Sequence, residues 1–268
     1  MKLAARAGRI VPSPTLAMTA KAKALVAQGV DVIDFASGEP DFDTPDHAKA
    51  AAEAAIRTGF TKYTPSSGTD ELRHAIAQKL EADHGLRYDK SQILVSCGAK
   101  HSLYNLAEAF YEAGDEVIIP TPYWVSYSDQ VLLNDATPVF LPTVEEEGYA
   151  IARTRLESVI TPRSKAIIVN SPCNPTGAMY DRATLEVIAD VALRHDLLIV
   201  SDEIYEKICY DGITQTSIAS LSPDVCARTV VINGVSKAYA MTGWRIGYAA
   251  GPKDLLTAMA NIQSQSTS

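Results

Sequence analysis

The chain has 268 residues, 47% of them hydrophobic and 21% charged, and its formal net charge at pH 7 is −8. These values describe a globular protein with room for a large buried core. An acidic chain has no general attraction for nucleic acid or anionic lipid, so we expect neither as a partner. The four cysteines form no C-x-x-C pair and suit no common zinc site, which predicts no metal and reduced thiols in a cytoplasmic protein. No apolar run approaches about 18 residues, and the N-terminus lacks a secretory apolar stretch, so we expect no membrane segment.

Short apolar runs rich in Val and Ile alternate with longer amphipathic segments. The expected helices, in chain order, are residues 45–58, 69–83, 99–113, 181–195 and 252–264. The expected strands are residues 93–96, 116–120, 138–141, 166–170, 197–202, 229–233 and 246–250. We expect Thr44 to cap the first helix and Gly114 to end the third. Continuous apolar strands separated by helices predict an α/β fold, with a mainly parallel seven-stranded sheet flanked by helices.

Polar turns follow four of these strands, and ligands of open α/β sheets bind at the carboxyl ends of strands. The turns are SCGAKH at 96–101, NSPCNPTG at 170–177, DEIY at 202–205 and GVSK at 234–237. Each has an ordinary interpretation, since a lone Lys is nearly always a surface charge and an Asp that ends a strand is usually a turn residue. Four such turns together predict a site at this edge of the sheet.

The most specific block is SKAYAMTGWRIG at 236–247, in which Lys237 stands eight residues before Arg245. NPTG at 174–177 and DEIY at 202–205 precede it along the chain. This ordered set resembles the class I and II aminotransferases, which are fold-type I enzymes that depend on pyridoxal 5′-phosphate (PLP).

The resemblance extends over essentially the whole chain, from SGEPDF at 37–42 through KYTPSSG at 62–68 to the last residues. PYWVSY at 122–127 and MTGWRIGY at 241–248 are similar to the bacterial aspartate/prephenate aminotransferase subgroup. One departure is Cys173, which stands where the family commonly has Asn.

The resemblance implies a role for each residue around the cofactor ring. Lys237 is expected to bind PLP as a Schiff base and, once released, to act as general base and acid. Asp202 is expected to keep the ring nitrogen protonated, which lets the ring accept electrons. Tyr205 and Asn174 match the residues that share the phenolic oxygen of the ring, and Trp124 matches the aromatic residue stacked on it.

The phosphate of the cofactor needs fixed donors. Gly98, Ala99 and Lys100 follow a strand and open a helix, where free N–H groups and the helix dipole favour an anion. The resemblance adds the Ser236 hydroxyl and the Arg245 guanidinium. Tyr63 matches a tyrosine that reaches the phosphate of the neighbouring subunit, which implies a homodimer with shared active sites.

Substrate binding is also read from the resemblance. Gly38 matches a glycine near the substrate carboxylate, and Thr15 and Lys100 match residues associated with dicarboxylic substrates. Trp124 and Asn174 are expected to contact the substrate as well. The expected reaction is ping-pong transamination between an acidic L-amino acid (aspartate, glutamate or the arogenate/prephenate pair) and a 2-oxo acid.

Other functions stay open at this point. An aromatic or broad-specificity aminotransferase, or another fold-type I PLP enzyme such as a β-lyase, would carry the same Lys237, Asp202 and Arg245. A PLP-binding domain of a transcription factor would need a DNA-binding region, of which the acidic chain shows none.

The resemblance also implies a domain division. Residues 1–44 are expected to form an N-terminal arm and part of a small domain, and residues 45–268 the large PLP-binding domain. Family members continue past residue 268 with the rest of the small domain and an arginine for the substrate α-carboxylate. We therefore expect the chain to be a C-terminal truncation.

Overall fold

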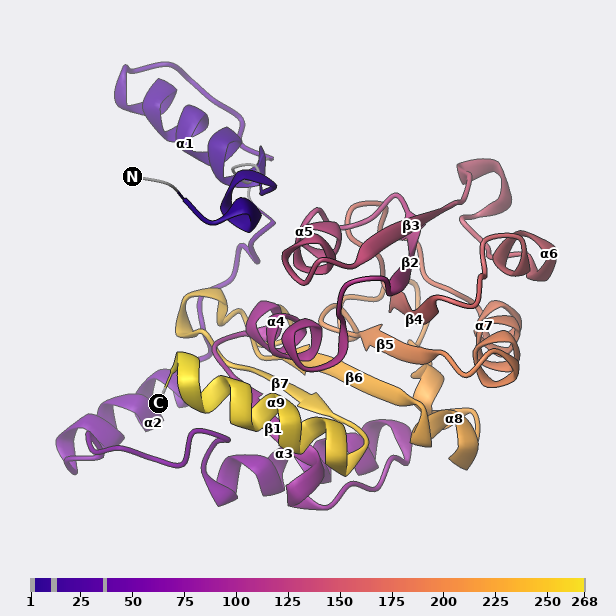
Figure 1. Ribbon diagram of the computed structural model, residues 1–268. Helices are drawn as coiled ribbons and strands as arrows, with labels where there is room; N and C mark the ends of the chain where they lie inside the picture. Colours follow the sequence, from indigo (N-terminus) through magenta and orange to yellow (C-terminus); the bar gives the residue numbers. More distant parts are fainter. Residues whose placement is uncertain (1–2, 11–13, 36–37, 268) are drawn as a thin grey trace.

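The computed structural model describes residues 3–10, 14–35 and 38–267. Within them, seven strands form one sheet with the order β1-β7-β6-β5-β4-β2-β3 (Figure 1). The strands are β1 Ile93–Ser96, β2 Glu116–Thr121, β3 Thr137–Pro142, β4 Ser164–Asn170, β5 Leu198–Asp202, β6 Thr229–Gly234 and β7 Gly247–Ala250. Strand β7 runs antiparallel to both of its neighbours, and the other pairs are parallel. The expected α/β fold with a mainly parallel seven-stranded sheet is confirmed.

The strands form where the apolar runs are because both faces of the sheet are covered. Every residue of β1, β5, β6 and β7 is buried, whereas the edge strand β3 is largely open to solvent. Successive residues of one strand point to opposite faces of the sheet and pack into different hydrophobic cores, as Ile118 and Ile119 of β2 do. A strand with two buried faces must be apolar throughout, which is the pattern that the sequence shows.

The described part of the chain contains nine α-helices. They are α1 Pro14–Ala27, α2 Asp46–Arg57, α3 Asp70–His84, α4 Ala99–Phe110, α5 Ser126–Leu133, α6 Arg153–Glu157, α7 Arg182–Arg194, α8 Pro223–Ala227 and α9 Lys253–Ser266. Short 3₁₀ turns lie at η1 Ala5–Gly8, η2 Lys90–Gln92, η3 Glu145–Glu147, η4 Ile218–Ser220 and η5 Thr242–Trp244. Helices α4, α5 and α9 share one core with the sheet, while α6, α7 and α8 pack into a second core and α3 into a third. Figure 1 shows α4 and α9 side by side over the sheet.

Two predicted helix ends are wrong. Thr44 does not cap α2, because its hydroxyl donates to the carbonyl of Ala240 at 2.7 Å and accepts from the indole of Trp244 at 3.0 Å. Helix α4 ends at Phe110 rather than near residue 113, because the buried Tyr111 adopts an extended conformation.

The N-terminal region makes few contacts with the sheet. Figure 1 shows α1 standing away from it, and the side chain of Arg9 reaches the end of α5 through an ion pair of 2.5 Å with Asp135. Helix α2 buries none of its residues. The division into domains at residues 44 and 45 stays a prediction. None of the described helices combines the length and apolarity needed to cross a membrane.

Candidate active site

Lys237 lies in the turn that follows β6. Its ammonium donates a hydrogen bond to the carbonyl of Gly38 and lies 5.7 Å from the centroid of the Tyr205 ring. Burial lowers the pKa of this amine; the carboxylate of Glu39 opposes that shift, and the positive charge of Arg245 adds to it. An amine with a lowered pKa is more often neutral, and so more nucleophilic, than an ordinary lysine.

Asp202 ends the central strand β5 and is 2% exposed. Its carboxylate accepts hydrogen bonds from the hydroxyl of Tyr127 at 2.6 Å and from the N–H of Ile204 at 3.2 Å. Burial raises the pKa of Asp202 to about 6, against the opposing effect of these two donors. A cation placed beside this carboxylate would favour its ionised form, because opposite charges attract strongly where water is excluded.

Tyr205 and Asn174 lie next to Asp202. The amide nitrogen of Asn174 donates to the hydroxyl of Tyr205 at 3.3 Å. Asn170 orients this pair, because its side chain accepts from the N–H of Asn174 at 2.8 Å and donates to the carbonyl of Asp202 at 3.0 Å. The turn after β4 and the turn after β5 are thus locked together at the carboxyl edge of the sheet.

Arg245 packs directly on the turn that opens α4. A Cβ atom on Gly98 would lie 2.2 Å from Nη2 of Arg245, and the φ of Gly98 is +86°, a backbone conformation that favours glycine. The guanidinium donates to the carbonyls of Thr242 at 2.8 Å and Cys97 at 3.3 Å.

Amide donors of α4 lie beside this guanidinium. The first hydrogen bond of α4 runs from the N–H of His101 to Gly98, which leaves the N–H groups of Ala99 and Lys100 ahead of the helical ladder. Ser236, 8% exposed, is the residue before Lys237. These groups form a cradle for an anion.

Lys100 and Trp124 form a second contact near this cradle. The ammonium of Lys100 lies 4.8 Å from the centroid of the Trp124 ring. Burial lowers the pKa of Lys100, and the charge of Arg245 lowers it further. Trp124 meets Tyr127 edge to face, with the ring centroids 5.4 Å apart.

Two of the expected site residues stand apart. Tyr63 is 91% exposed, and Thr15 is an exposed residue of α1 whose carbonyl accepts from Thr19. Within the described ranges, neither side chain forms a hydrogen bond with the group around Lys237. Ser37, the first residue of the motif at 37–42, lies outside the described residues.

Two residues of this region were given no role from the sequence. Tyr127 is the partner of Asp202, and Glu39 acts on the pKa of Lys237 while accepting a hydrogen bond from Thr242. The spacing of Tyr127, three residues after Trp124, was a usable signal, because residues three apart at a helix start lie on one face.

A cavity of about 550 Å³ lies beside the Lys237 turn rather than within the cluster. Its walls are formed by residues 39, 40, 42–44, 240 and 242–244, and neither Asp202 nor Lys237 lines it. We place the chemistry in the cluster, because the perturbed amine, the buried carboxylate and the anion cradle converge there.

These groups fit PLP. The amine of Lys237 suits an aldehyde, the buried Asp202 suits a protonated pyridine nitrogen, and the cradle at Gly98 and Arg245 suits a phosphate. The close approach of Arg245 to Gly98 places the guanidinium beside the turn that opens α4. Fold and side chains together define a fold-type I PLP-dependent enzyme.

Comparison with known proteins gives the family. Residues 30–268 match the aminotransferase class I and II family, and the chain belongs to this family. It is 53% identical over 268 residues to the aspartate aminotransferase of Geobacillus stearothermophilus and 52% identical over 269 residues to the aspartate/prephenate aminotransferase of Nitrosomonas europaea. All of this chain is covered in both cases, and it spans 68% of the length of each relative. The solved structure of aspartate aminotransferase from Thermus thermophilus with maleate superposes with a TM-score of 0.96 at 46% identity, covering 99% of this chain and 69% of that one.

Proposed function

We propose that the protein transfers an amino group from an acidic L-amino acid to a 2-oxo acid by a ping-pong mechanism with PLP. The observation that carries the proposal is the position of Lys237. Its amine, with a lowered pKa, lies over the ring of Tyr205 in the same cluster as the buried Asp202.

The chain's own residues divide the work. Bound PLP supplies an electron sink for the pair of electrons left when the α-carbon of an amino acid loses its proton. Lys237 would bond to the aldehyde carbon with loss of water, and its amine, once displaced by the amino group of the substrate, would move that proton as general base and acid. Asp202 would hold a proton on the ring nitrogen, and Tyr205 and Asn174 would donate hydrogen bonds to the phenolic oxygen.

The substrate class rests on Lys100. A cation beside the aromatic face of Trp124 can pair with the second carboxylate of aspartate or glutamate. Gly38, whose carbonyl contacts Lys237, and Thr15 complete the proposed substrate contacts. The two relatives described above are named for aspartate, and one of them also for prephenate. An aromatic aminotransferase or a β-lyase would share the Lys237 cluster, so only a substrate panel separates these alternatives.

The proposal includes a homodimer with shared active sites. The end of α2 and the loop after it expose large side chains, with Ile56 70%, Phe60 64% and Tyr63 91% open to solvent. A surface of this kind favours association with a second subunit. Mixing Tyr63→Phe subunits with Lys237→Ala subunits should then restore about a quarter of wild-type activity, because half of the dimers are hybrids and each hybrid has one intact site. Failure of the mixture to exceed either variant alone would oppose shared sites.

The four cysteines are unpaired in the structure, as in proteins of a reducing compartment, which supports a cytoplasmic location. Residues 1–44 act as an arm and part of a small domain, which the separate position of α1 supports (Figure 1).

The deciding experiment is a half-reaction screen. The PLP-loaded protein is mixed with single amino acids, and conversion of the cofactor to its amine form is followed by absorbance. Aspartate and glutamate should convert it, and alanine and phenylalanine should convert it much more slowly. Fastest conversion by phenylalanine would favour the aromatic alternative, and release of ammonia would favour a lyase.

A further inference from the structure

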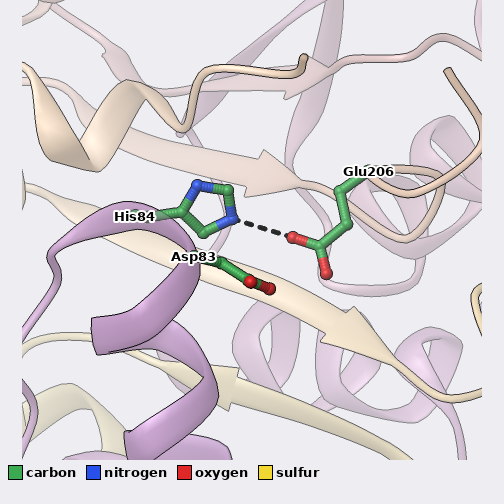
Figure 2. A group of neighbouring side chains, drawn as sticks. All are labelled: Asp83, His84 and Glu206. Carbon is green, nitrogen blue, oxygen red and sulfur yellow. Dashed lines mark hydrogen bonds and ion pairs between the residues drawn. The ribbon is translucent and has the colours of Figure 1, made fainter. Parts of the chain in front are cut away.

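A second polar group lies against the turn that carries Asp202 and Tyr205. Figure 2 shows Asp83 and His84, at the end of α3, beside Glu206. The ring Nε2 of His84 lies 2.9 Å from the carboxylate of Glu206. Lys79, one turn earlier on α3, pairs with the same carboxylate. The side chain of Glu206 is 3% exposed, and that of His84 8%.

The geometry of Asp83, His84 and Glu206 resembles that of metal ligands, yet the group already contains its own cations. Lys79 pairs with Glu206 and lies 3.4 Å from Asp83, and Lys207 lies 2.9 Å from Asp83. Each carboxylate therefore has an ammonium partner, and a divalent cation would have to displace a lysine. This arrangement is an internal ion-pair network rather than a metal site.

The network connects to the catalytic turn through the spacing of its residues. Asp202 and Tyr205 contact Tyr127 and Asn174, whereas Glu206 contacts α3. The turn closes through a hydrogen bond of 3.0 Å from the N–H of Glu206 to the carbonyl of the residue three positions earlier. Contacts that fix the side chain of Glu206 therefore also fix the backbone of Tyr205, the residue before it.

Glu203 strengthens the same attachment. It is 1% exposed, and its carboxylate accepts from the hydroxyls of Ser201 at 2.8 Å and Ser217 at 2.7 Å. The side chains of Asp202 and Tyr205 thus lie at the site, and the acidic side chains of Glu203 and Glu206 lie in the protein interior. The titratable groups that act on or pair with Glu206 or its partners are Lys79, Asp83, His84, Glu203, Lys207 and Tyr248.

We propose that Glu206 is a positioning residue for transamination: held by Lys79 and His84 of α3, it fixes the turn that carries Asp202 and Tyr205. The proposal rests on the proposed function, because Asp202 and Tyr205 act on the cofactor ring. Burial of Glu206 raises its pKa, but the His84 hydrogen bond and the Lys79 charge outweigh burial, so the carboxyl stays ionised.

The test is Glu206→Gln, which keeps the shape of the side chain and removes its charge. We expect kcat to fall on the order of tenfold to a hundredfold with KM changed much less, because the groups on the ring are misplaced rather than lost. The pH at which the absorbance of the bound cofactor changes should shift. Amide hydrogen exchange of residues 203–208 should be faster in both the PLP-loaded and the PLP-stripped protein.

Glu81→Gln is the matched control, because it removes a carboxylate of α3 that pairs with Arg87 at 2.8 Å and lies outside the network of Glu206. It should leave the kcat, the absorbance titration and the exchange at residues 203–208 near wild type. Lys79→Met tests the other partner of Glu206 and serves if Glu206→Gln folds poorly; it should reproduce the loss of kcat.

The outcomes separate this proposal from the function it rests on. A wild-type protein that converts no amino acid would overturn the proposed function. Amide hydrogen exchange in the PLP-stripped variants would still report whether Glu206 fixes the turn to α3. Glu206→Gln and Lys79→Met proteins with unchanged kcat and exchange, or with losses matched by Glu81→Gln, would overturn the positioning role.

Discussion

The hydroxyl of Tyr127 donates to Oδ2 of Asp202 across 2.6 Å, although the two residues are 75 positions apart in the chain. Both side chains are 2% exposed, and Tyr127 also supports the edge of Trp124. One turn at the start of α5 therefore supplies the proposed ring-stacking residue and the partner of the proposed ring-nitrogen carboxylate.

Tyr127→Phe removes this donor and nothing else from the side chain. The pKa of Asp202 should rise further, so that the carboxyl holds the ring-nitrogen proton less well. We expect kcat/KM in the half-reaction to fall about tenfold and the unfolding free energy to fall by about 1–3 kcal/mol. Tyr123→Phe is the control, because its hydroxyl donates to Ser128 at 3.2 Å and not to Asp202. Equal effects of the two variants would contradict a specific role for Tyr127.

The stability of the PLP-free protein should depend on pH through Asp202. Its folded pKa, about 6, lies above the ordinary value of 3.8, so the folded state binds the proton more tightly. The contribution of this group is therefore fully present below about pH 4 and is lost as pH rises through about 6, by about 3 kcal/mol. Urea unfolding of the wild type and of Asp202→Asn from pH 4 to about 7.5 gives the unfolding free energy of each as a function of pH. The difference between the two measures the contribution of Asp202. A difference that stays constant over this range would refute the raised pKa.

Lys237→Ala should abolish covalent attachment of PLP. The variant should lose the visible absorbance of the lysine-bound cofactor, and borohydride treatment should add no cofactor mass to the protein. Lys100→Ala is the control, since Lys100 lies over Trp124, and it should keep both signals. Cofactor mass retained in Lys237→Ala would mean that another lysine binds PLP.

Gly247→Ala tests the contact between β7 and the anion cradle. A Cβ atom at residue 247 would lie 2.1 Å from the nitrogen of Ala99 and 2.2 Å from the carbonyl carbon of Gly98. The backbone has to shift, so we expect a loss of about 2–3 kcal/mol in unfolding free energy and weaker PLP binding. Gly243→Ala has no atom within 4 Å of its new Cβ and should change neither value by much. Wild-type PLP affinity in Gly247→Ala would show that the cradle does not depend on this contact.

Most of the secondary structure could be predicted because it depends on local patterns. Strands buried on both faces are continuous apolar runs, and Thr69 and Asp181 cap α3 and α7 with side chains that the sequence displays. Helices α1, α5, α6 and α8 were not predicted. Helices α6 and α8 have five residues each, and one turn and a half carries no periodic signal, while α1 does not gather its apolar residues on one side.

The roles of the candidate site residues were inferred from the resemblance of the ordered motifs to a family. That these residues lie close together was inferred from their positions directly after strands. The carboxyl ends of β4, β5 and β6 lie at one edge of a parallel sheet, so Asn174, Asp202 and Lys237 had to be near one another. Tyr63 and Thr15 could not be placed this way, because neither follows a strand of the sheet.

By itself, the sequence determined the strands and the polar turns that follow them, and it singled out Lys237 as the proposed cofactor lysine, because these depend on residues close in the chain. Only the tertiary structure decided that β7 runs antiparallel between β1 and β6, that Tyr127 meets Asp202, and that Glu206 meets α3. The two side-chain pairings, Tyr127 with Asp202 and His84 with Glu206, join residues 75 and 122 positions apart. A hydrogen bond or buried ion pair over such a separation forms only when the packing of whole elements brings its atoms within about 3 Å, which local sequence patterns do not specify.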